Sequence, residues 1–450
     1  SSAGHRRGGR LAEHPHRNAL LLTAPALAAA ALTTAMAAPL LRLTAGPVIE
    51  ALGSPVGAIV ALSALAFFAP SFLAGVPAPV LAHVAIASEP ARAGRSLGLM
   101  FAAGALGAIC GTLLAGFLFI SWLGTILTMA VVAVTYATLA LVLVFAAQPR
   151  HIARQPAMIV AILGVAIAAL TPLLPNPCTR ESDYFCIRAI DVSAEAGAPA
   201  RLMVIDHLGH GISAGDDPLR MLTPQTAMLD ELGRRRMEGQ SPFRAYFIGG
   251  GSYSVPRAWT EPPAAARVTV AEIDPAVTAV AVADFWLDTT RMDIVHRDAR
   301  LALVRSNETY DVIVGDAFTD IAAPAHLVTD EFFGLVASRL NPGGVYLMNV
   351  VDRIGTLDAL ASVVATLRRS FPVVEVWAEE TTPVPGERAV FILLAASTQT
   401  PFSRLDGRTP DWIRSGRLTP KAVDALVARR KPVILTDDFA PIDRLIGRFD

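Results

Sequence analysis

Charged residues are scarce in this chain. Asp, Glu, Lys and Arg together make up 17% of its 450 residues, whereas hydrophobic residues make up 53%. So few charges exclude a fully soluble protein, and we expect part of the chain to lie in a membrane. The formal net charge of −1 supplies no general attraction for a polyanion, so we expect no nucleic-acid partner.

Cysteine is also rare, with three residues in the whole chain. Cys110 lies in an apolar run and is predicted to be a small packing residue. Cys178 and Cys186 lie eight positions apart and could close a disulfide if their domain faces an oxidising compartment. Two unpaired thiols remain the alternative. Histidines and cysteines show no metal-ligand spacing, so no metal site is predicted.

Long hydrophobic runs gather in the first part of the chain, and each can cross roughly 30 Å of hydrocarbon. We predict about five membrane spans, near residues 19–41, 55–86, 97–120, 123–147 and 157–174. No charged residue lies in the middle of a span, so we expect an anchor or a binding vestibule rather than a pump. The sequence does not begin with Met, which indicates truncation or processing and leaves the number of upstream helices open.

Arginines cluster before and between the predicted spans. They are Arg6, Arg7, Arg10, Arg17, Arg92, Arg95, Arg150 and Arg154. The positive-inside rule places these segments in the cytoplasm, and a fifth span would then carry the C-terminal region to the other side. A count that differs by one helix would reverse this result, so the side of the membrane stays open.

A different pattern follows the last apolar run. Two short strands, near 185–192 and 200–206, predict a small β-hairpin. Strands then alternate with helical patterns, which predicts a seven-strand α/β domain. The predicted strands lie near 245–249, 268–273, 292–297, 310–316, 343–350, 373–379 and 388–396. We therefore expect four regions, namely a transmembrane region (1–175), a hairpin subdomain with a gate segment (176–240), a Rossmann-like nucleoside-binding domain (241–400) and a C-terminal tail that packs on it (401–450).

Three consecutive glycines, Gly249, Gly250 and Gly251, follow the first strand of this domain, and the second strand ends at Glu272. Glycines let the backbone approach a ligand closely, and an acidic residue at the end of the next strand can accept both hydroxyls of a ribose. The spacing Gly-x-Gly-x-x-Gly is absent, and Pro256 lies where a pyrophosphate-binding helix would offer free amides. The pattern favours S-adenosylmethionine or a relative over NAD. A tight glycine turn without a ligand is the alternative.

Further motifs follow the glycines in a fixed order. They are Glu272-Ile-Asp-Pro275, Asp298-Ala299, the strand and loop 310–318, and Leu340-Asn-Pro-Gly-Gly344. In this order they resemble the spermidine synthase family, and the chain is still more similar to bacterial membrane proteins in which a spermidine synthase-like domain follows transmembrane helices. The resemblance implies an S-adenosylmethionine methyltransferase-type fold in the bacterial inner membrane. It also implies a transferase of polyamine biosynthesis that moves an aminopropyl group from decarboxylated S-adenosylmethionine to a small-molecule amine, without a metal.

The resemblance also implies roles for individual residues. The three glycines lie beneath the nucleoside and Glu272 binds its ribose, while Asp298 and Ala299 meet the adenine ring. Asp316 positions the ligand. Asp320 helps to deprotonate the attacking amine, because only a neutral amine can displace the sulfonium leaving group. The alternatives are a helix N-cap for Asp298 and loop caps for the two later aspartates.

Two histidines, His207 and His210, lie in a segment that matches a ligand-contacting sequence of the family, and His210 takes the place of a glutamine. His210 is therefore predicted to bind the co-substrate, with a structural role as the alternative for both.

Other positions depart from the family. Ser252 stands where spermidine synthases have an acid that holds the amino end of the donor, and a neutral serine holds that charge less well. The positive charge of Arg220, in the gate segment, would repel a dicationic polyamine. Asp437 and Asp438 are candidates for the missing negative charge. Two alternatives therefore stay open: methyl or other alkyl transfer from S-adenosylmethionine, and a transporter or sensor with a non-catalytic ligand-binding domain. A homodimer is compatible with the sequence, which does not fix the oligomeric state.

Overall fold

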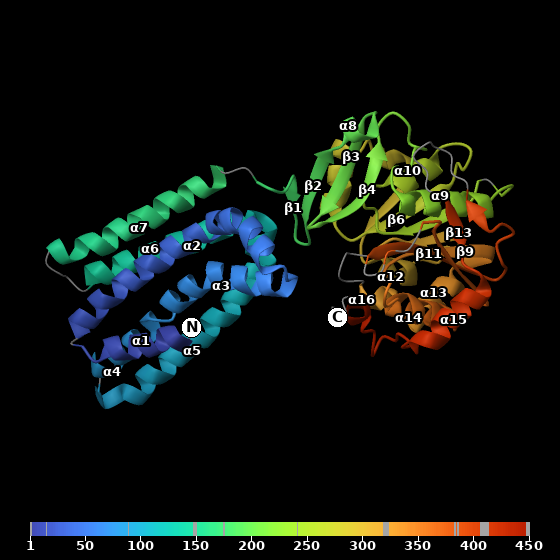
Figure 1. Ribbon diagram of the computed structural model, residues 1–450. Helices are drawn as coiled ribbons and strands as arrows, with labels where there is room; N and C mark the ends of the chain where they lie inside the picture. Colours follow the sequence, from blue (N-terminus) through green and yellow to red (C-terminus); the bar gives the residue numbers. More distant parts are fainter. Residues whose placement is uncertain are drawn as a thin grey trace. The chain divides into compact units, whose positions relative to one another are not determined.

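The computed structural model describes residues 2–14, 16–88, 90–146, 151–173, 176–240, 242–317, 324–381, 384, 387–405 and 414–446. The chain divides into two compact units, Ser1–Pro177 and Cys178–Asp450 (Figure 1). The first unit is helical, and the second contains two β-sheets with helices around the larger one.

The helices of the first unit are α1 (Ser2–Ala12), α2 (His16–Leu52), α3 (Pro55–Ala74), α4 (Pro77–Ser88), α5 (Ala93–Leu114), the π-helical turn η2 (Ala115–Phe119), α6 (Ile120–Ala146) and α7 (His151–Leu170). Helices α2, α6 and α7 lie side by side in Figure 1. Their contact is built largely from alanines, among them Ala28, Ala31, Ala137, Ala140 and Ala161. Small side chains let helix backbones approach closely, which is the usual way helices associate in lipid.

Among the described residues, four helical stretches are long and apolar enough to cross a membrane. They are Ala19–Leu52, Val56–Ser88, Pro90–Ala146 and Gln155–Leu173. The third has 57 residues and contains the predicted span 97–120 and all but the last residue of the predicted span 123–147. Its backbone leaves the helical conformation at Gly124 (φ 68°, ψ 178°). A helix of that length would measure about 85 Å, more than twice the roughly 30 Å hydrocarbon layer, so the stretch is long enough for two passes that join at Gly124.

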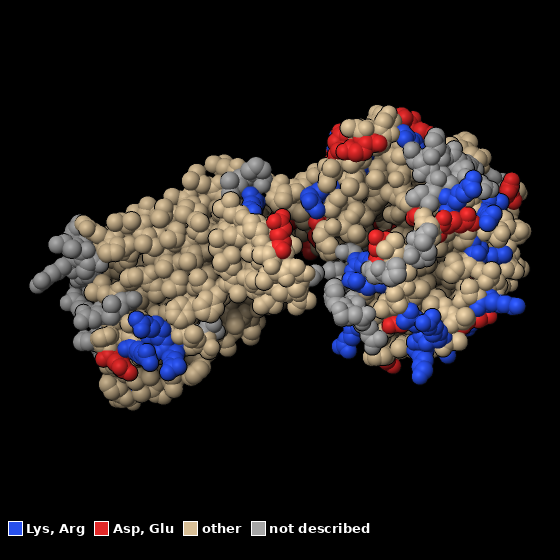
Figure 2. Space-filling model, viewed as in Figure 1, with Lys and Arg blue, Asp and Glu red and all other residues tan. Residues whose placement is uncertain are grey.

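The surface of the helical unit is apolar. Large hydrophobic side chains are exposed on it, including Phe68 (67%), Phe101 (72%) and Trp122 (82%). On the face shown in Figure 2 this unit is mostly uncharged, whereas acidic and basic residues are spread over the second unit. Exposed apolar surface of this extent suits contact with lipid.

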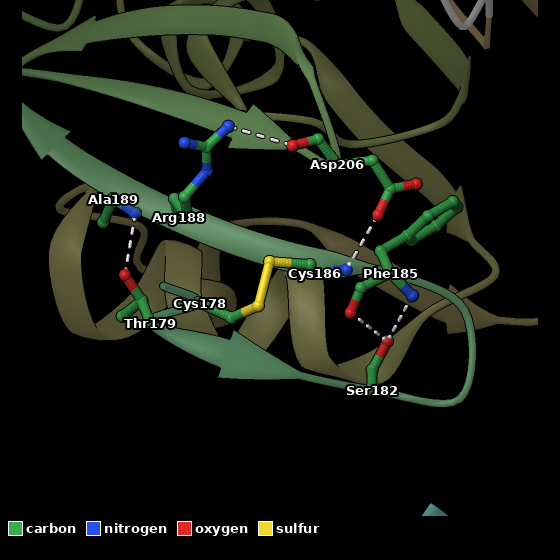
Figure 3. Close-up of a disulfide and its surroundings, with 8 residues drawn as sticks. All are labelled: Cys178, Thr179, Ser182, Phe185, Cys186, Arg188, Ala189 and Asp206. Atoms are coloured by element: carbon green, nitrogen blue, oxygen red, sulfur yellow. Dashed lines mark hydrogen bonds between the residues drawn. A yellow bond between two sulfur atoms is a disulfide. The ribbon is translucent and has the colours of Figure 1, made fainter. Parts of the chain in front are cut away.

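The second unit begins with a four-stranded antiparallel sheet formed by β1 (Arg180–Glu181), β2 (Cys186–Asp191), β3 (Ala200–Ile205) and β4 (Leu208–Ala214). The short helix α8 (Ser193–Ala196) connects β2 to β3, and these two strands occupy the segments expected to form a hairpin. Cys178 and Cys186 form a disulfide with a Cα–Cα distance of 5.3 Å (Figure 3). Of the two alternatives left open by the sequence, the structure has the disulfide.

The larger sheet has nine strands in the order β12-β13-β10-β11-β9-β8-β5-β6-β7. All seven predicted strands are present: β5 (Arg244–Ile248), β6 (Arg267–Glu272), β7 (Asp293–His296), β8 (Tyr310–Gly315), β9 (Leu340–Arg353), β10 (Val373–Glu379) and β11 (Arg388–Ala396). Two short strands that were not predicted, β12 (Arg404–Leu405) and β13 (Ser415–Arg417), lie beyond β10 on one side of the sheet. Strands β5 to β9 run parallel to one another, whereas the pairs β9–β11, β11–β10, β10–β13 and β13–β12 are antiparallel. The predicted Rossmann-like fold is confirmed.

Helices cover both faces of the larger sheet. One face packs against α9 (Pro224–Arg236), α10 (Ser254–Thr260) and α11 (Pro275–Asp284). The other packs against α12 (Ala299–Arg305), α13 (Asp330–Ser338), α14 (Asp358–Leu367), α15 (Pro420–Arg430) and α16 (Ile442–Ile446). Alternate residues of β5 serve the two cores, with Phe247 in the first and Tyr246 in the second, as the two-residue period of a strand requires.

The chain reverses its direction across the sheet between β5 and β8. From β5 it proceeds to β6 and β7 on one side, and β8 then lies on the other side of β5. Ligands of open α/β sheets bind beyond the carboxyl ends of the strands at such a point. The three glycines follow β5 directly and therefore lie at this point.

Candidate functional site

A cavity of about 490 Å³ opens at the carboxyl edge of the larger sheet. Residues from successive strands line it: Gly249 after β5, Glu272 at the end of β6, Asp298 after β7, Asp316 after β8 and Asn349 in β9. The volume lies in the range that small-molecule and cofactor sites use. The cavity therefore combines a suitable size with a suitable place in the fold.

The glycine loop is close to its neighbours on two sides. Gly249 (φ 89°) and Gly251 (φ 50°) have left-handed backbone conformations, which glycine adopts without strain. A Cβ atom on Gly249 would lie 3.0 Å from the carbonyl oxygen of Asp316, and one on Gly250 would lie 2.3 Å from the ring of Tyr253. The glycines are thus needed both for the turn and for the packing around it.

The carboxylate of Glu272 holds the glycine loop through a hydrogen bond. Its side chain is buried, with 6% of the residue exposed. One carboxylate oxygen accepts the Gly250 N–H and the other accepts the Asp274 N–H, both at 2.9 Å. Burial raises the pKa of Glu272, and these N–H donors oppose the rise. Each oxygen keeps a second acceptor position, so the carboxylate can hold the loop and still accept a hydroxyl from a ligand in the cavity.

Asp298 is the N-cap of α12 and also lines the cavity. One of its oxygens accepts the Leu301 N–H at 2.8 Å, and the other is 2.7 Å from Nε2 of His326. The capping role, considered as an alternative, is therefore real and does not remove the residue from the site. Ala299, the next residue, also lines the cavity, and its carbonyl oxygen accepts the hydroxyl of Tyr246 at 2.9 Å.

Asp316 lies in the floor of the cavity, and its carboxylate accepts the side-chain amide of Asn349 at 3.1 Å. The surrounding protein atoms remove enough water to raise the pKa of Asp316, although the cavity leaves the residue open to solvent. The Asn349 amide and His210 oppose this rise. A carboxyl group held in this way can be an acceptor or, when protonated, a donor.

His210 lines the same cavity from β4. Its Nε2 is buried and has no hydrogen-bond partner among the described residues. Burial lowers the pKa of His210, while the carboxylates of Asp316 and Asp206 oppose that shift and His207 adds to it. An imidazole whose neutral form is favoured therefore lies in the cavity wall, with its Nε2 covered by protein atoms. His207 is not among the lining residues.

Other predicted residues are placed elsewhere. Asp320 lies outside the described residues. Ser252 is 2% exposed and its hydroxyl lies 2.7 Å from that of Ser254, inside the protein. Arg220 donates to the carbonyl oxygen of Ala196 at 2.9 Å and is not one of the residues that line the cavity. The expected conflict between Arg220 and a cationic acceptor therefore has no basis in this geometry.

Sequence reasoning missed several polar side chains in the cavity wall, among them Asn349, His326 and Arg388. Asn349 could have been found, because a polar residue in the middle of an apolar strand needs a partner. His326 and Arg388 carry no such signal. Asp437, considered as a supplier of negative charge, accepts both terminal nitrogens of Arg300 at 2.6 Å, so its charge is already engaged. Within the described part of the chain, no group of three or more His, Cys, Asp or Glu could hold a metal ion.

Comparison with known proteins identifies curated proteins that are similar in sequence and solved structures with a similar fold. No family model matches the chain. A probable polyamine aminopropyl transferase of Bifidobacterium longum is 33% identical over 105 residues, which are 22% of this chain and 23% of that protein. Polyamine aminopropyltransferase 2 of Streptomyces coelicolor is 26% identical over 395 residues, 78% of this chain and 68% of that protein. The chain thus spans less than a quarter of the first relative.

A crystal structure of a probable spermidine synthase from Corynebacterium glutamicum superimposes with a TM-score of 0.50 at 21% identity, covering 58% of this chain and 96% of that one. At this identity the likeness establishes the fold alone. Together with the curated relatives it confirms the resemblance stated from the sequence, and the second unit is spermidine synthase-like.

Proposed function

We propose that the protein is a membrane-anchored transferase that binds decarboxylated S-adenosylmethionine or S-adenosylmethionine and transfers an aminopropyl group to an amine. One observation carries the proposal: the glycine loop, Glu272, Asp298 and Asp316 line a single cavity at the reversal point of the sheet. The names of the two curated relatives support the reaction.

Different residues of the cavity bind different parts of the donor. Glu272 accepts the ribose hydroxyls while it holds the Gly250 N–H. Asp298 and Ala299 meet the adenine ring beside His326. Asp316 faces the aminopropyl end, and the imidazole of His210 contacts the ligand at the same level of the cavity. A ligand that fills the cavity displaces water from around the sulfonium, which strengthens each of these polar contacts.

The transfer step is a displacement at carbon. The lone pair of the acceptor nitrogen forms a bond to the propyl carbon, the carbon–sulfur bond breaks, and its electrons remain on sulfur, which gives neutral methylthioadenosine. The acceptor loses one proton, for which Asp320 is the predicted base. The reaction requires an amine nucleophile in its neutral form and a site from which water that could compete with it is displaced.

Binding of the nucleoside tests the proposal first. Isothermal titration of detergent-purified full-length protein with methylthioadenosine is expected to show one site with micromolar affinity, whereas NAD at the same concentration gives no heat. Absence of binding by any adenosine thioether or sulfonium would reject the proposed function.

Methyl transfer from S-adenosylmethionine is a second candidate, favoured by Ser252. The position where the family holds the amino end of the donor has a buried hydroxyl instead of an acid. The two reactions leave different nucleosides, methylthioadenosine after aminopropyl transfer and S-adenosylhomocysteine after methyl transfer, so product analysis separates them.

We also propose that the second unit faces the extracytoplasmic side of a bacterial inner membrane. Disulfides persist in oxidising compartments, and Cys178 is paired with Cys186. The arginines between the apolar runs support the same orientation through the positive-inside rule. The donor must then reach the site from the cytoplasm or be supplied outside.

A further inference from the structure

Strand β4 packs against the glycine loop and against α10, the helix that follows the loop. It is the last strand of the smaller sheet, in the order β1-β2-β3-β4, and it lies beside α10 (Figure 1). A Cβ atom on Gly251 would lie 2.9 Å from the carbonyl oxygen of His210, and one on Gly211 would collide with the hydroxyl of Ser252. Neither glycine could therefore carry a side chain unless β4 and the loop moved apart.

Three carbonyl oxygens of β4, at alternate residues, accept hydrogen bonds from the segment 252–257. His210 accepts the Ser252 N–H at 3.2 Å, Ile212 accepts the Ser254 hydroxyl at 3.0 Å, and Ala214 accepts both terminal nitrogens of Arg257 at 3.3 Å. The edge strand of a sheet presents a row of backbone groups that need partners. At these three positions the glycine loop and α10 supply the partners, so β4 is held along most of its length.

Three buried serines add side-chain contacts to this row. Ser213, Ser252 and Ser254 are 1%, 2% and 5% exposed, and we call them the serine network. The hydroxyl of Ser213 donates to the carbonyl oxygen of Ser252 at 2.8 Å and lies 3.0 Å from the hydroxyl of Ser254. Because the Ser254 proton goes to Ile212, the Ser252 hydroxyl, 2.7 Å away, is the donor to Ser254. Every hydroxyl proton of the network therefore has an acceptor, as buried polar groups require.

The network accounts for the serine that stands in place of an acid at position 252. The Ser252 hydroxyl is directed at Ser254, and Ser252 is not one of the residues that line the large cavity. Its hydroxyl therefore binds another part of the protein and not the donor.

The segments that the network joins both reach the cavity. His210 lines it from β4, two residues before Ile212, while Gly249 and Gly251 line it from the loop. A shift of β4 would therefore move the imidazole relative to the glycines. We propose that the serine network positions β4 on the glycine loop and thereby fixes the imidazole of His210 against a bound nucleoside; the inference rests on the proposed function. The serines themselves do not touch the donor.

A double-mutant cycle tests whether the serines act through His210. Ser254→Ala removes the donor to Ile212 and the acceptor of the Ser252 hydroxyl, and it is expected to weaken binding of methylthioadenosine to detergent-purified full-length protein about fivefold. With His210→Ala already present, the same change is expected to weaken binding less than about twofold, because residues that act as one unit give non-additive effects. Equilibrium dialysis measures the affinity of each member of the cycle.

Two further serine variants make the cycle specific. Ser213→Ala interrupts the same network from β4 and should behave like Ser254→Ala, so the result does not depend on one variant. Ser338→Ala is the matched control, since this exposed serine also donates its hydroxyl to a carbonyl oxygen, that of Leu335, at 2.7 Å. It should leave the affinity unchanged with and without His210.

Nuclear magnetic resonance of the His210 imidazole gives a second readout. Burial lowers the pKa of His210 in the wild type, where Asp316, Asp206 and His207 face it. When the network is cut, β4 is expected to loosen and to admit water to the ring, so the pKa in Ser254→Ala should rise toward the ordinary value of 6.5. An unchanged pKa in folded Ser254→Ala would contradict the proposal.

The outcomes of the cycle are separable. Equal losses of affinity with and without His210 overturn the inference, because the serines then contribute only to folding, and so does a Ser254→Ala protein that binds as well as the wild type. If both serine variants fail to fold, hydrogen–deuterium exchange of the wild type decides the question. Methylthioadenosine is expected to slow exchange in β4 and in the glycine loop together, and protection of the loop alone overturns the inference. Absence of methylthioadenosine binding by the wild type rejects the proposed function itself.

Discussion

We propose two tasks for Glu272 that a sequence pattern cannot separate. The pattern predicts a ribose ligand, and the structure adds the two backbone N–H groups that the same carboxylate accepts. In Glu272→Gln the amide nitrogen faces one of these donors, so the glycine loop loses a hydrogen bond. We expect the affinity for methylthioadenosine to fall about tenfold or more, a loss of one or two hydrogen bonds to a charged group. Equilibrium dialysis measures it, with the exposed Glu195→Gln as control; equal affinities of the two variants would contradict the role.

We expect Asp316 to support activity while it lowers the stability of the folded protein. Its folded-state pKa is raised, so the folded protein holds the proton more tightly than the unfolded chain, and this contribution to stability is lost as pH rises through the folded-state pKa. Asp316→Asn removes the ionisable group and keeps the shape. Its thermal unfolding midpoint at neutral pH should rise, while transfer activity should fall about 100-fold or more. A lower midpoint, or retained activity, would count against this role.

The pKa of His210 is shifted in the opposite direction to that of Asp316. Burial lowers its folded-state pKa below the ordinary value of 6.5, so the unfolded chain binds the proton better and stability is lost as pH falls below that value. The groups that face it are Asp316, Asp206 and His207. In His210→Gln, the drop in unfolding midpoint from about pH 7.5 to about pH 5.5 should be smaller than in the wild type. Identical drops in the two proteins would refute the assignment.

Elements with a strong repeating pattern are those that the sequence predicts. The seven strands β5 to β11 were all located, because buried strands leave apolar runs that can be seen without tertiary information. Strands β12 and β13 have two and three residues and leave no such run. The capping role of Asp298 is also predictable from the sequence, because an Asp before a helical pattern is typical of an N-cap. The position of Arg388 is not, since only the sheet order brings β11 beside β9 and the cavity. The position of His326, in the short turn Ala325–Leu327, leaves no repeating pattern either.

The segment closed by the disulfide carries part of the cavity wall. Cys178 and Cys186 are separated by 8 positions, and Tyr184 and Phe185, which line the cavity, lie between them. Within the same segment Ser182 accepts the Phe185 N–H at 3.0 Å (Figure 3). The disulfide therefore restricts the part of the chain that carries both rings.

Loss of the disulfide should weaken folding and binding together. Cys178→Ser is expected to lower the free energy of unfolding by about 2–3 kcal/mol and to reduce the affinity for methylthioadenosine several-fold. Denaturant unfolding and equilibrium dialysis measure the two effects, with Cys110→Ser as the matched control. A variant as stable as this control would show that the disulfide does not hold the segment.

At the scale of the whole molecule, hydropathy alone defines the helical unit, because each span must be apolar along its own length. The number of spans is harder to read. About five predicted spans correspond to four helical stretches, since the third continues through a π-helical turn and changes direction at Gly124. A glycine between two apolar runs does not show by itself whether the helix ends there or bends.

The orientation proposed for the second unit rests on the disulfide and the arginines. In intact cells that express Cys110→Ser, Cys178 and Cys186 are the two cysteines that remain in this chain. A membrane-impermeant reductant followed by a membrane-impermeant maleimide is expected to label them without lysis. Labelling that occurs only after lysis would place the second unit in the cytoplasm.

The central claim is that this cavity transfers an aminopropyl group. Mass spectrometry of the nucleosides left after full-length protein is incubated separately with decarboxylated S-adenosylmethionine and S-adenosylmethionine, each with an amine, tests it most directly. We predict methylthioadenosine from the decarboxylated donor and none from Asp316→Asn. Formation of S-adenosylhomocysteine alone, or consumption of neither donor, would contradict the claim.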